Sequence, residues 1–257
     1  MIGFLIKKNF FDLWDNLFKI ALINLGFIAS LFLLVFILQL FKQLPLLGLA
    51  VLLVGLFWCF VYLQAAALSM KFISDYGSFG FMDFLLNIKT AWPFGLLLGG
   101  LVFLGYLLCA VAIPFYLSME SIFGLLLAAL IFWTLLAALL ALQFFFAVRS
   151  RLDTKPFKVI KKCFVIFFDN PAFCVFSLLH NLLVLALSAF AAFLFPGPAG
   201  ILLFLDEGLR LRLLKYDWLE ANPETKSREI PWDAILIDER EKTGDRSFRN
   251  FIFPWKD

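Results

Sequence analysis

Long uncharged stretches constrain the fold of this chain more than any other feature. Residues 20–41 contain no charged side chain, and similar stretches of about 20 residues recur along the sequence. A helix rises 1.5 Å per residue, so each stretch can cross the roughly 30 Å hydrocarbon layer of a bilayer. Of the 257 residues, 63% are hydrophobic and 16% charged, against about 45–50% and 25% in soluble domains. The sequence therefore predicts an all-α integral membrane protein.

Six apolar segments qualify as membrane spans. They are residues 20–41, 46–72, 94–118, 122–148, 171–195 and 198–214. The short turns "KQLP", "SMES" and "PGP" join them in pairs. Because such short turns only connect neighbouring antiparallel helices, we expect three helical hairpins.

The distribution of basic residues predicts the orientation. Lys and Arg gather before the first span, between hairpins and after the sixth span, whereas the opposite side carries only Lys42. Basic residues are retained on the cytoplasmic side of a membrane. We therefore expect both termini in the cytoplasm, with a six-helix transmembrane domain at residues 1–216 and a cytoplasmic tail at residues 217–257.

A short amphipathic segment precedes each hairpin. The three segments read "NFFDLWDNLFK", "FGFMDFLLNIK" and "TKPFKVIKKCFVIFFDN". They predict interfacial helices between the hairpins and suggest three copies of one helix-plus-hairpin unit. The alternative is that any protein with several spans shows such junctions.

The third amphipathic segment carries a basic face. This face consists of Lys155, Lys158, Lys161 and Lys162. It suits anionic lipid headgroups, because each charge near such a surface contributes about 1 kcal/mol. The alternative is an orientation signal that has no specific ligand.

Charged and polar residues interrupt the last two spans. The sequence "ILLFLDEGLRLRLLKYDW" brings Asp206, Glu207 and Arg210 after only five apolar residues, and the fifth span contains His180 and Asn181. The i+4 and i+3 spacing predicts that Arg210 faces both carboxylates on one side of the helix. Antiparallel pairing would bring His180 level with them. The alternative is that the sixth span is short and leaves these charges at an interface.

The five polar residues of these spans allow two interpretations. A membrane-embedded polar cluster can bind protons or solutes, but it can equally be a set of hydrogen bonds that joins two helices. Phosphate-binding loops, zinc-binding motifs and nucleophile motifs are absent from the sequence. We therefore predict no catalytic residue, no metal, no cofactor, no nucleic-acid partner and no enzymatic activity.

Two further segments carry specific expectations. Gly95 and Gly99 have the small-xxx-small spacing that lets membrane helices approach closely. The alternative is that this spacing arises by chance in a glycine-rich span. At the C-terminus, "RSFRNFIFPWKD" places aromatic residues among bases. Such a segment lies at a membrane interface, or it covers the cytoplasmic face of the bundle or a partner.

Three parts of the sequence resemble one protein family. The segments "FFDLWDNLFKIALINL", "FMDFLLNIKTAWPFGLLLGGLVF" and "PFKVIKKCFVIFFDNPAFCVF" are similar to the DUF624 (YesL-like) bacterial membrane proteins, over roughly residues 10–215. The resemblance implies a location in the bacterial inner membrane. It also implies an accessory role beside carbohydrate ABC uptake systems, with an ABC permease as partner.

Two functions remain open from the sequence. The first is a non-enzymatic accessory or scaffold protein, favoured by the missing catalytic motifs and by the resemblance. The second is a small-solute or proton-coupled transporter or channel that uses His180, Asp206 and Arg210, favoured by the charges within the spans alone. A third, a lipid-modifying enzyme, lacks a visible nucleophile and base.

Overall fold

The computed structural model describes residues 1–224, 230–244 and 246, and all regular elements in this part of the chain are helical. In chain order they are α1 (Ile2–Asp15), α2 (Leu17–Leu40), α3 (Pro45–Ser74), α4 (Phe81–Leu107), a π-helical turn η1 (Leu108–Ala112), α5 (Ile113–Leu117), α6 (Ile122–Leu142), α7 (Phe145–Arg151), α8 (Pro156–Asp169), α9 (Pro171–Phe190), α10 (Gly197–Ala221), α11 (Trp232–Ile235) and α12 (Ile237–Thr243).

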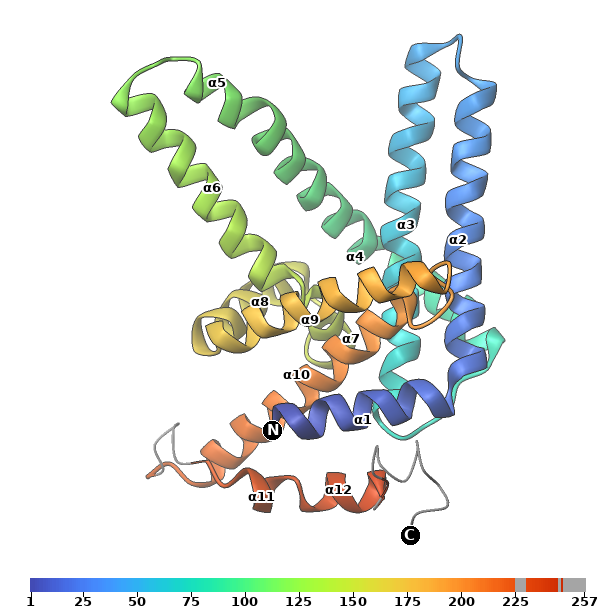
Figure 1. Cartoon of the computed structure of the whole chain (residues 1–257), viewed down its shortest axis with the longest axis vertical. Helices are drawn as coiled ribbons and strands as arrows, with labels where there is room; N and C mark the ends of the chain where they lie inside the picture. The colour runs from blue at the N-terminus through green and yellow to red at the C-terminus, as the bar shows by residue number, and fades with distance from the viewer. Residues whose placement is uncertain (225–229, 245, 247–257) are drawn as a thin grey trace.

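Two long hairpins rise from a common end of the molecule, which we call the base (Figure 1). One hairpin is α2 with α3, and the other is α4, η1 and α5 with α6. They diverge away from the base, where α1, α11 and α12 lie (Figure 1). In each hairpin the neighbouring helices are joined by a short turn. The predicted arrangement of the spans as hairpins across a membrane stays a prediction.

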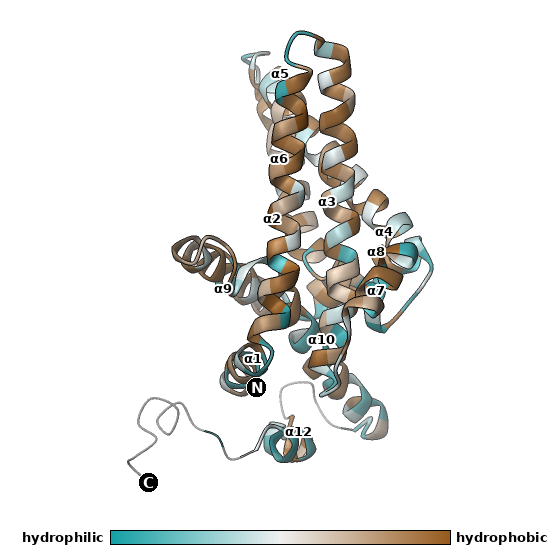
Figure 2. Cartoon of the chain, turned by 90° about the vertical axis from the view of Figure 1, so that its right-hand side faces the viewer, coloured by the Kyte–Doolittle hydropathy of each residue, from teal (hydrophilic) through white to brown (hydrophobic). Residues whose placement is uncertain are grey.

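Among the described residues, five helical segments are long and apolar enough to cross a membrane. They are Leu17–Leu40, Pro45–Ser74, Phe81–Leu117, Ile122–Arg151 and Pro171–Phe190. Hydrophobic residues make up most of the outer part of the α2/α3 hairpin (Figure 2), and many of their side chains are exposed, such as Phe32 at 72% and Val54 at 71%. Such a surface is too apolar for water and suits lipid. The prediction of a multi-pass helical membrane protein is confirmed.

The last two predicted spans are arranged differently from the first four. Helix α9 runs across the view in Figure 1, and Figure 2, turned by 90°, shows it nearly end-on. It packs against α6, α8 and α10. Helix α10 then descends from the end of α9 to the base (Figure 1). Because α10 is interrupted by charge, it is not among the five candidate spans. The sixth span and the threefold repeat of hairpins are not confirmed.

Asn24 fixes the start of α10. Its side-chain amide donates to the carbonyls of Leu194 (3.0 Å) and Pro196 (2.8 Å), and its Oδ1 accepts from the Ala199 N–H (2.9 Å). Asn24 lies seven residues along α2, about 10 Å from the start of that helix. Helix α10 therefore begins well short of the far end of the first span.

The amphipathic segments are helical, but the three differ in form. Helices α1 and α8 are separate elements, whereas the second segment continues without a break into α4 through Pro93. A proline removes one backbone hydrogen bond, which the long helix tolerates here. Near the outer end of the same span, the π-helical turn η1 comes just before Pro114.

The glycine pair of α4 packs closely on α3. A Cβ atom added to Gly95 would lie 2.5 Å from the Cα of Val61, and one added to Gly99 would lie 2.8 Å from the ring of Phe57. Neither distance leaves room for a side chain. Helices α3 and α4 therefore approach closely at Gly95 and Gly99, and α4 leads to a hairpin that diverges from the α2/α3 hairpin (Figure 1).

The C-terminal segment lies against the base. Helices α11 and α12 run beneath α10 and α1 (Figure 1), and Leu236 between them is fully buried. The predicted boundary between residues 216 and 217 falls inside α10, so the division into two domains stays a prediction. The aromatic residues predicted to line an interface or a partner, at positions 248–255, lie outside the described residues.

Candidate functional site

The polar residues predicted to form one cluster occupy two separate places. The ring of His180 stacks on Phe204, with 3.7 Å between ring centroids, and also lies beside Phe176. His180 Nδ1 and Asn181 Oδ1 have no hydrogen-bond partner among the described residues. No ion pair joins His180 to Asp206 within this part of the chain. The contact between histidine and carboxylate that antiparallel pairing would allow is therefore not found among the described residues.

Asp206 joins α10 to the ends of two other helices. The guanidinium of Arg151, the last residue of α7, donates from Nε to Asp206 Oδ1 (2.9 Å) and forms a second contact with Oδ2. Ser150 Oγ lies 3.2 Å from the same Oδ1. Arg151 also reaches Asp75 (2.9 Å) and the hydroxyl of Ser74 (2.8 Å), at the end of α3. One arginine thus connects α3, α7 and α10.

Arg210 forms its ion pairs with residues outside its own helix. It pairs with Asp75, donates to the carbonyl of Ser74 (3.1 Å), and donates to Glu239 of α12 (2.7 Å). The expectation that Arg210 pairs with both Asp206 and Glu207 is wrong. Carboxylates on other elements lie in better positions, so tertiary contacts replace the i+3 and i+4 pairs.

Glu207 is the most deeply buried acid of the site. Its side chain is fully buried, and neither carboxylate oxygen has a hydrogen-bond partner among the described residues. The nearest cation is Lys8 of α1, whose Nζ lies 3.8 Å from Glu207 Oε1 and 2.5 Å from Asp12. Lys8 also lies over the ring of Tyr76, 3.9 Å from its centroid. Helix α1 is therefore tied to α10 through a buried lysine.

Tyr76 connects this lysine to the C-terminal segment. Its hydroxyl donates to Glu239 Oε2 (2.9 Å) and lies 3.2 Å from Thr243 Oγ1, both on α12. Burial raises the pKa of Tyr76, and the nearby charge of Glu239 raises it further. The phenol is therefore kept neutral and able to donate to Glu239.

These contacts form one continuous group of charges, which we call the base network. Its acids and bases come from α1, the end of α3, α7, α10 and α12. They are Asp12, Asp75, Asp206, Glu207, Glu239, Lys8, Arg151 and Arg210. Because its members close the ends of α3 and α7 and bind α12, the network lies at the base rather than midway along the hairpins.

Five members of the base network, Asp12 among them, are not among the site residues that the sequence predicts. From the sequence, Lys8 and Arg151 contribute only to the predicted orientation in the membrane. No local pattern assigns a role to Asp75 or Glu239. One sequence signal could have identified the pair of Asp75 and Arg151, because each residue follows shortly after an apolar span at the same end of the molecule. An acidic and a basic residue at neighbouring ends of two spans can form an ion pair.

A smaller polar group links α8 to α10. Lys215 Nζ lies 3.1 Å from Asp169 Oδ2, which also accepts from the hydroxyl of Tyr216 (2.7 Å), and Asn170 donates to that hydroxyl (2.6 Å). Burial alone would raise the pKa of Asp169, but the hydrogen bonds from Tyr216 and Lys215 outweigh it and lower the pKa. This group holds the second half of α10 in place.

The basic face of α8 is only partly free for lipid headgroups. Lys155, Lys158 and Lys161 are exposed beside Phe157, which is 87% exposed, whereas Lys162 pairs with Asp153 at 3.4 Å. Exposed lysines next to an exposed aromatic ring are typical of a helix at a membrane surface. The assignment of this face to anionic headgroups stays a prediction.

Among the described residues, the charged side chains of the site contact other parts of the same chain. Within residues 1–224, 230–244 and 246, no three His, Cys, Asp or Glu side chains are grouped so that they could hold a metal ion. The grooves that we find between helices are apolar, and none is lined by His180, Asp206, Glu207 or Arg210. Comparison with known protein families, curated proteins and solved structures found no match. The resemblance to the DUF624 family therefore stays an expectation.

Proposed function

We propose that this integral membrane protein is a non-enzymatic accessory or scaffold protein of the bacterial inner membrane. In this proposal the two hairpins anchor it in lipid, and the base presents a cytoplasmic surface to a membrane partner. The resemblance of three segments to the DUF624 family suggests the permease of a carbohydrate ABC uptake system as that partner. The exposed lysines of α8 would hold the base against anionic headgroups.

The base network is the observation that supports this role. Asp206, Glu207 and Arg210 of α10 each pair with a residue on another element, so these residues join α1, α3, α7, α10 and α12. A transporter would be expected to direct such groups at a water-filled path across the membrane. Here the charges are used to build a rigid base.

The proposed topology places both termini in the cytoplasm. The α2/α3 and α4–α6 hairpins each return the chain to the side it left. The α9/α10 pair also returns to the base, since α10 begins only about 10 Å along the first span. Both termini then share the side that carries most Lys and Arg, as the positive-inside rule requires.

One observation favours the alternative of a proton-coupled transporter. Glu207 is a fully buried carboxyl group without a hydrogen bond among the described residues, and it lies beside Lys8. Buried ionisable groups of this kind occur in proton relays. In this alternative the protein reconstituted into liposomes would carry a proton flux that depends on Glu207.

Cross-linking in intact membranes tests the proposed role. After cross-linking and purification in a mild detergent, we expect one membrane protein to be recovered reproducibly with this chain. Ile237 is 53% exposed on α12, so Ile237→Glu should reduce that recovery without unfolding the base. The matched control is Lys42→Glu, at the opposite end of the α2/α3 hairpin, which should leave recovery unchanged.

Two results would contradict the accessory role. One is purification without any specific partner, even after cross-linking. The other is proton flux into liposomes that is abolished in Glu207→Gln, which would favour the transporter. Recovery of an ABC permease would support the narrower form of the proposal.

A further inference from the structure

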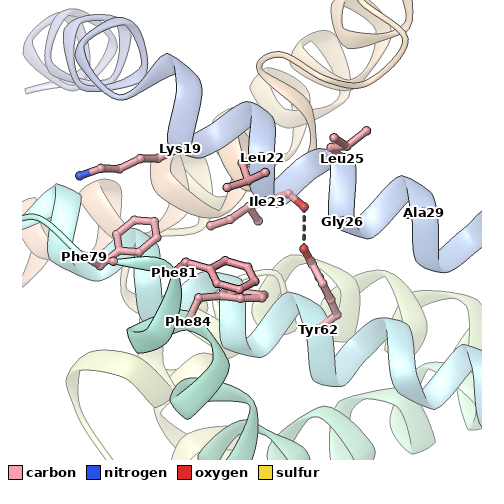
Figure 3. A pocket seen from close by; sticks show the side chains of 11 residues that line it. Lys19, Leu22, Ile23, Leu25, Gly26, Ala29, Tyr62, Phe79, Phe81 and Phe84 are labelled. Carbon is pink, nitrogen blue, oxygen red and sulfur yellow. Dashed lines mark hydrogen bonds between the residues drawn. The ribbon is translucent and has the colours of Figure 1, made fainter.

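A deep apolar groove opens between α2, α3 and the start of α4, away from the base network. Its volume is about 500 Å³, and its walls include Gly26, Ala29, Tyr62, Phe79 and Phe84 (Figure 3). Leu22 on α2 and Phe81 on α4 border it and are 55% and 64% exposed. The groove is therefore open to whatever surrounds the hairpins.

One cation lies at the end of this groove nearest the base. Lys19, in the first turn of α2, extends over Phe79, with Nζ 5.5 Å from the ring centroid (Figure 3). Its hydrogen-bond partner is the neutral hydroxyl of Ser78, at 2.6 Å. None of the ion pairs among the described residues involves Lys19. Its charge is therefore not neutralised within this part of the chain.

The polar groups next to the groove already form hydrogen bonds within the protein. The N–H of Gly80, which precedes α4, donates to Asp83 (2.8 Å), and the Tyr62 hydroxyl donates to the carbonyl of Ile23 (2.7 Å). A Cβ atom at Gly26 would lie 2.3 Å from this hydroxyl, so glycine is needed for the contact. The groove thus offers one free charge at its mouth and an apolar interior.

The length of the groove matches one leaflet of a membrane. From Lys19 to Ala29, α2 advances ten residues, or about 15 Å along its axis. This is half of the roughly 30 Å hydrocarbon layer. A groove that begins at a cation near the membrane surface and runs one leaflet deep has the dimensions of a phospholipid.

We propose that this groove binds an anionic phospholipid of the leaflet next to the base, with the phosphate beside Lys19 and Ser78 and one acyl chain along Gly26 and Ala29. Charge complementarity selects an anionic headgroup, because Lys19 has no acidic partner among the described residues. The apolar walls hold the acyl chain through van der Waals contacts. The site is distinct from the basic face of α8.

Photo-cross-linking tests this site in reconstituted vesicles. The full chain is placed in phosphatidylcholine vesicles that contain a trace of a phospholipid with a photoreactive group in one acyl chain, either phosphatidylglycerol or phosphatidylcholine. We expect cross-links on residues 22–29 and 79–84, with about fivefold more from phosphatidylglycerol, the effect of one lysine near an anionic group.

Four variants give the expected pattern its specificity. Lys19→Gln should remove the preference for phosphatidylglycerol, and Lys19→Arg should retain it. Ala29→Phe should reduce labelling of the groove by both lipids, since the larger side chain fills the groove. Lys89→Gln, which alters an exposed lysine of α4 outside the groove, should change nothing. Equal labelling by both lipids, labels spread evenly over the exposed apolar surface, or an unchanged preference in Lys19→Gln would overturn the proposal.

Discussion

Replacing Arg151 with methionine should destabilise this protein by about 3–5 kcal/mol, the usual cost of removing one partner from a buried ion pair. Asp206 is 1% exposed and Arg151 9% exposed, so the carboxylate would remain buried without its cation. The same change removes the contacts of Arg151 with Ser74 and Asp75. Thermal or denaturant unfolding of the purified protein, followed by the accessibility of its buried cysteines, measures the loss.

A second substitution separates charge from packing. In Arg151→Met with Asp206→Asn, the buried negative charge is also removed, and most of the lost stability should return. Arg240→Met provides the control, because the pair of Arg240 with Asp233 is exposed and should contribute about 0–1 kcal/mol. Equal effects of Arg151→Met and Arg240→Met would show that the base network does not hold the fold together.

Substituting Gly95 with leucine should separate α4 from α3 and cost about 3 kcal/mol, at the upper end of the usual cost of overpacking. An added Cβ would lie 2.5 Å from the Cα and 2.6 Å from the N of Val61, and backbone atoms cannot move aside as a flexible side chain would. Reduced yield of folded protein and a lower unfolding temperature would report the change.

The control for this position lies on the same helix. A Cβ atom added to Gly100 would have no neighbouring heavy atom within 4 Å, so Gly100→Leu adds the same apolar volume without a clash. It should leave folding unchanged. If Gly95→Leu and Gly100→Leu behave alike, close packing of α3 on α4 does not determine the position of the second hairpin.

The first four spans can be predicted because their signals are local. The predicted span at residues 20–41 corresponds closely to α2, since an uncharged apolar run of this length has few other stable conformations in lipid. The glycine spacing at Gly95 is also a local signal in the sequence, because only a small side chain permits such a close approach. These features depend on residues that lie close together in the sequence.

The sixth span is not confirmed, and the reason is physical. Leucines on several faces of α10 indicate lipid on all sides, yet Leu209 and Leu211 are fully buried within the protein. Lipid and protein interiors are both apolar, so composition alone does not distinguish them. Burial of a central helix among α1, α2, α3 and α7 requires knowledge of the tertiary fold.

The partners of the charged residues also cannot be found from local spacing. Asp206 pairs with Arg151, which lies 55 positions earlier in the sequence, rather than with Arg210 on its own helix. Arg210 pairs with Glu239, in a segment that the sequence predicts to be a separate tail. Spacing along a helix predicts which side chains can meet, but it does not show when a distant residue competes for the same carboxylate.

Buried charges join the C-terminal segment to the base, and hydrogen–deuterium exchange of α12 in lipid nanodiscs tests this claim most directly. We expect slow exchange of the backbone amides of Ile237–Thr243 in the unmodified protein, and fast exchange in Arg210→Gln, which loses the contact with Glu239. Arg240→Gln should leave the exchange slow. Exchange at the rate of a free peptide in the unmodified protein, or no change in Arg210→Gln, would contradict the claim.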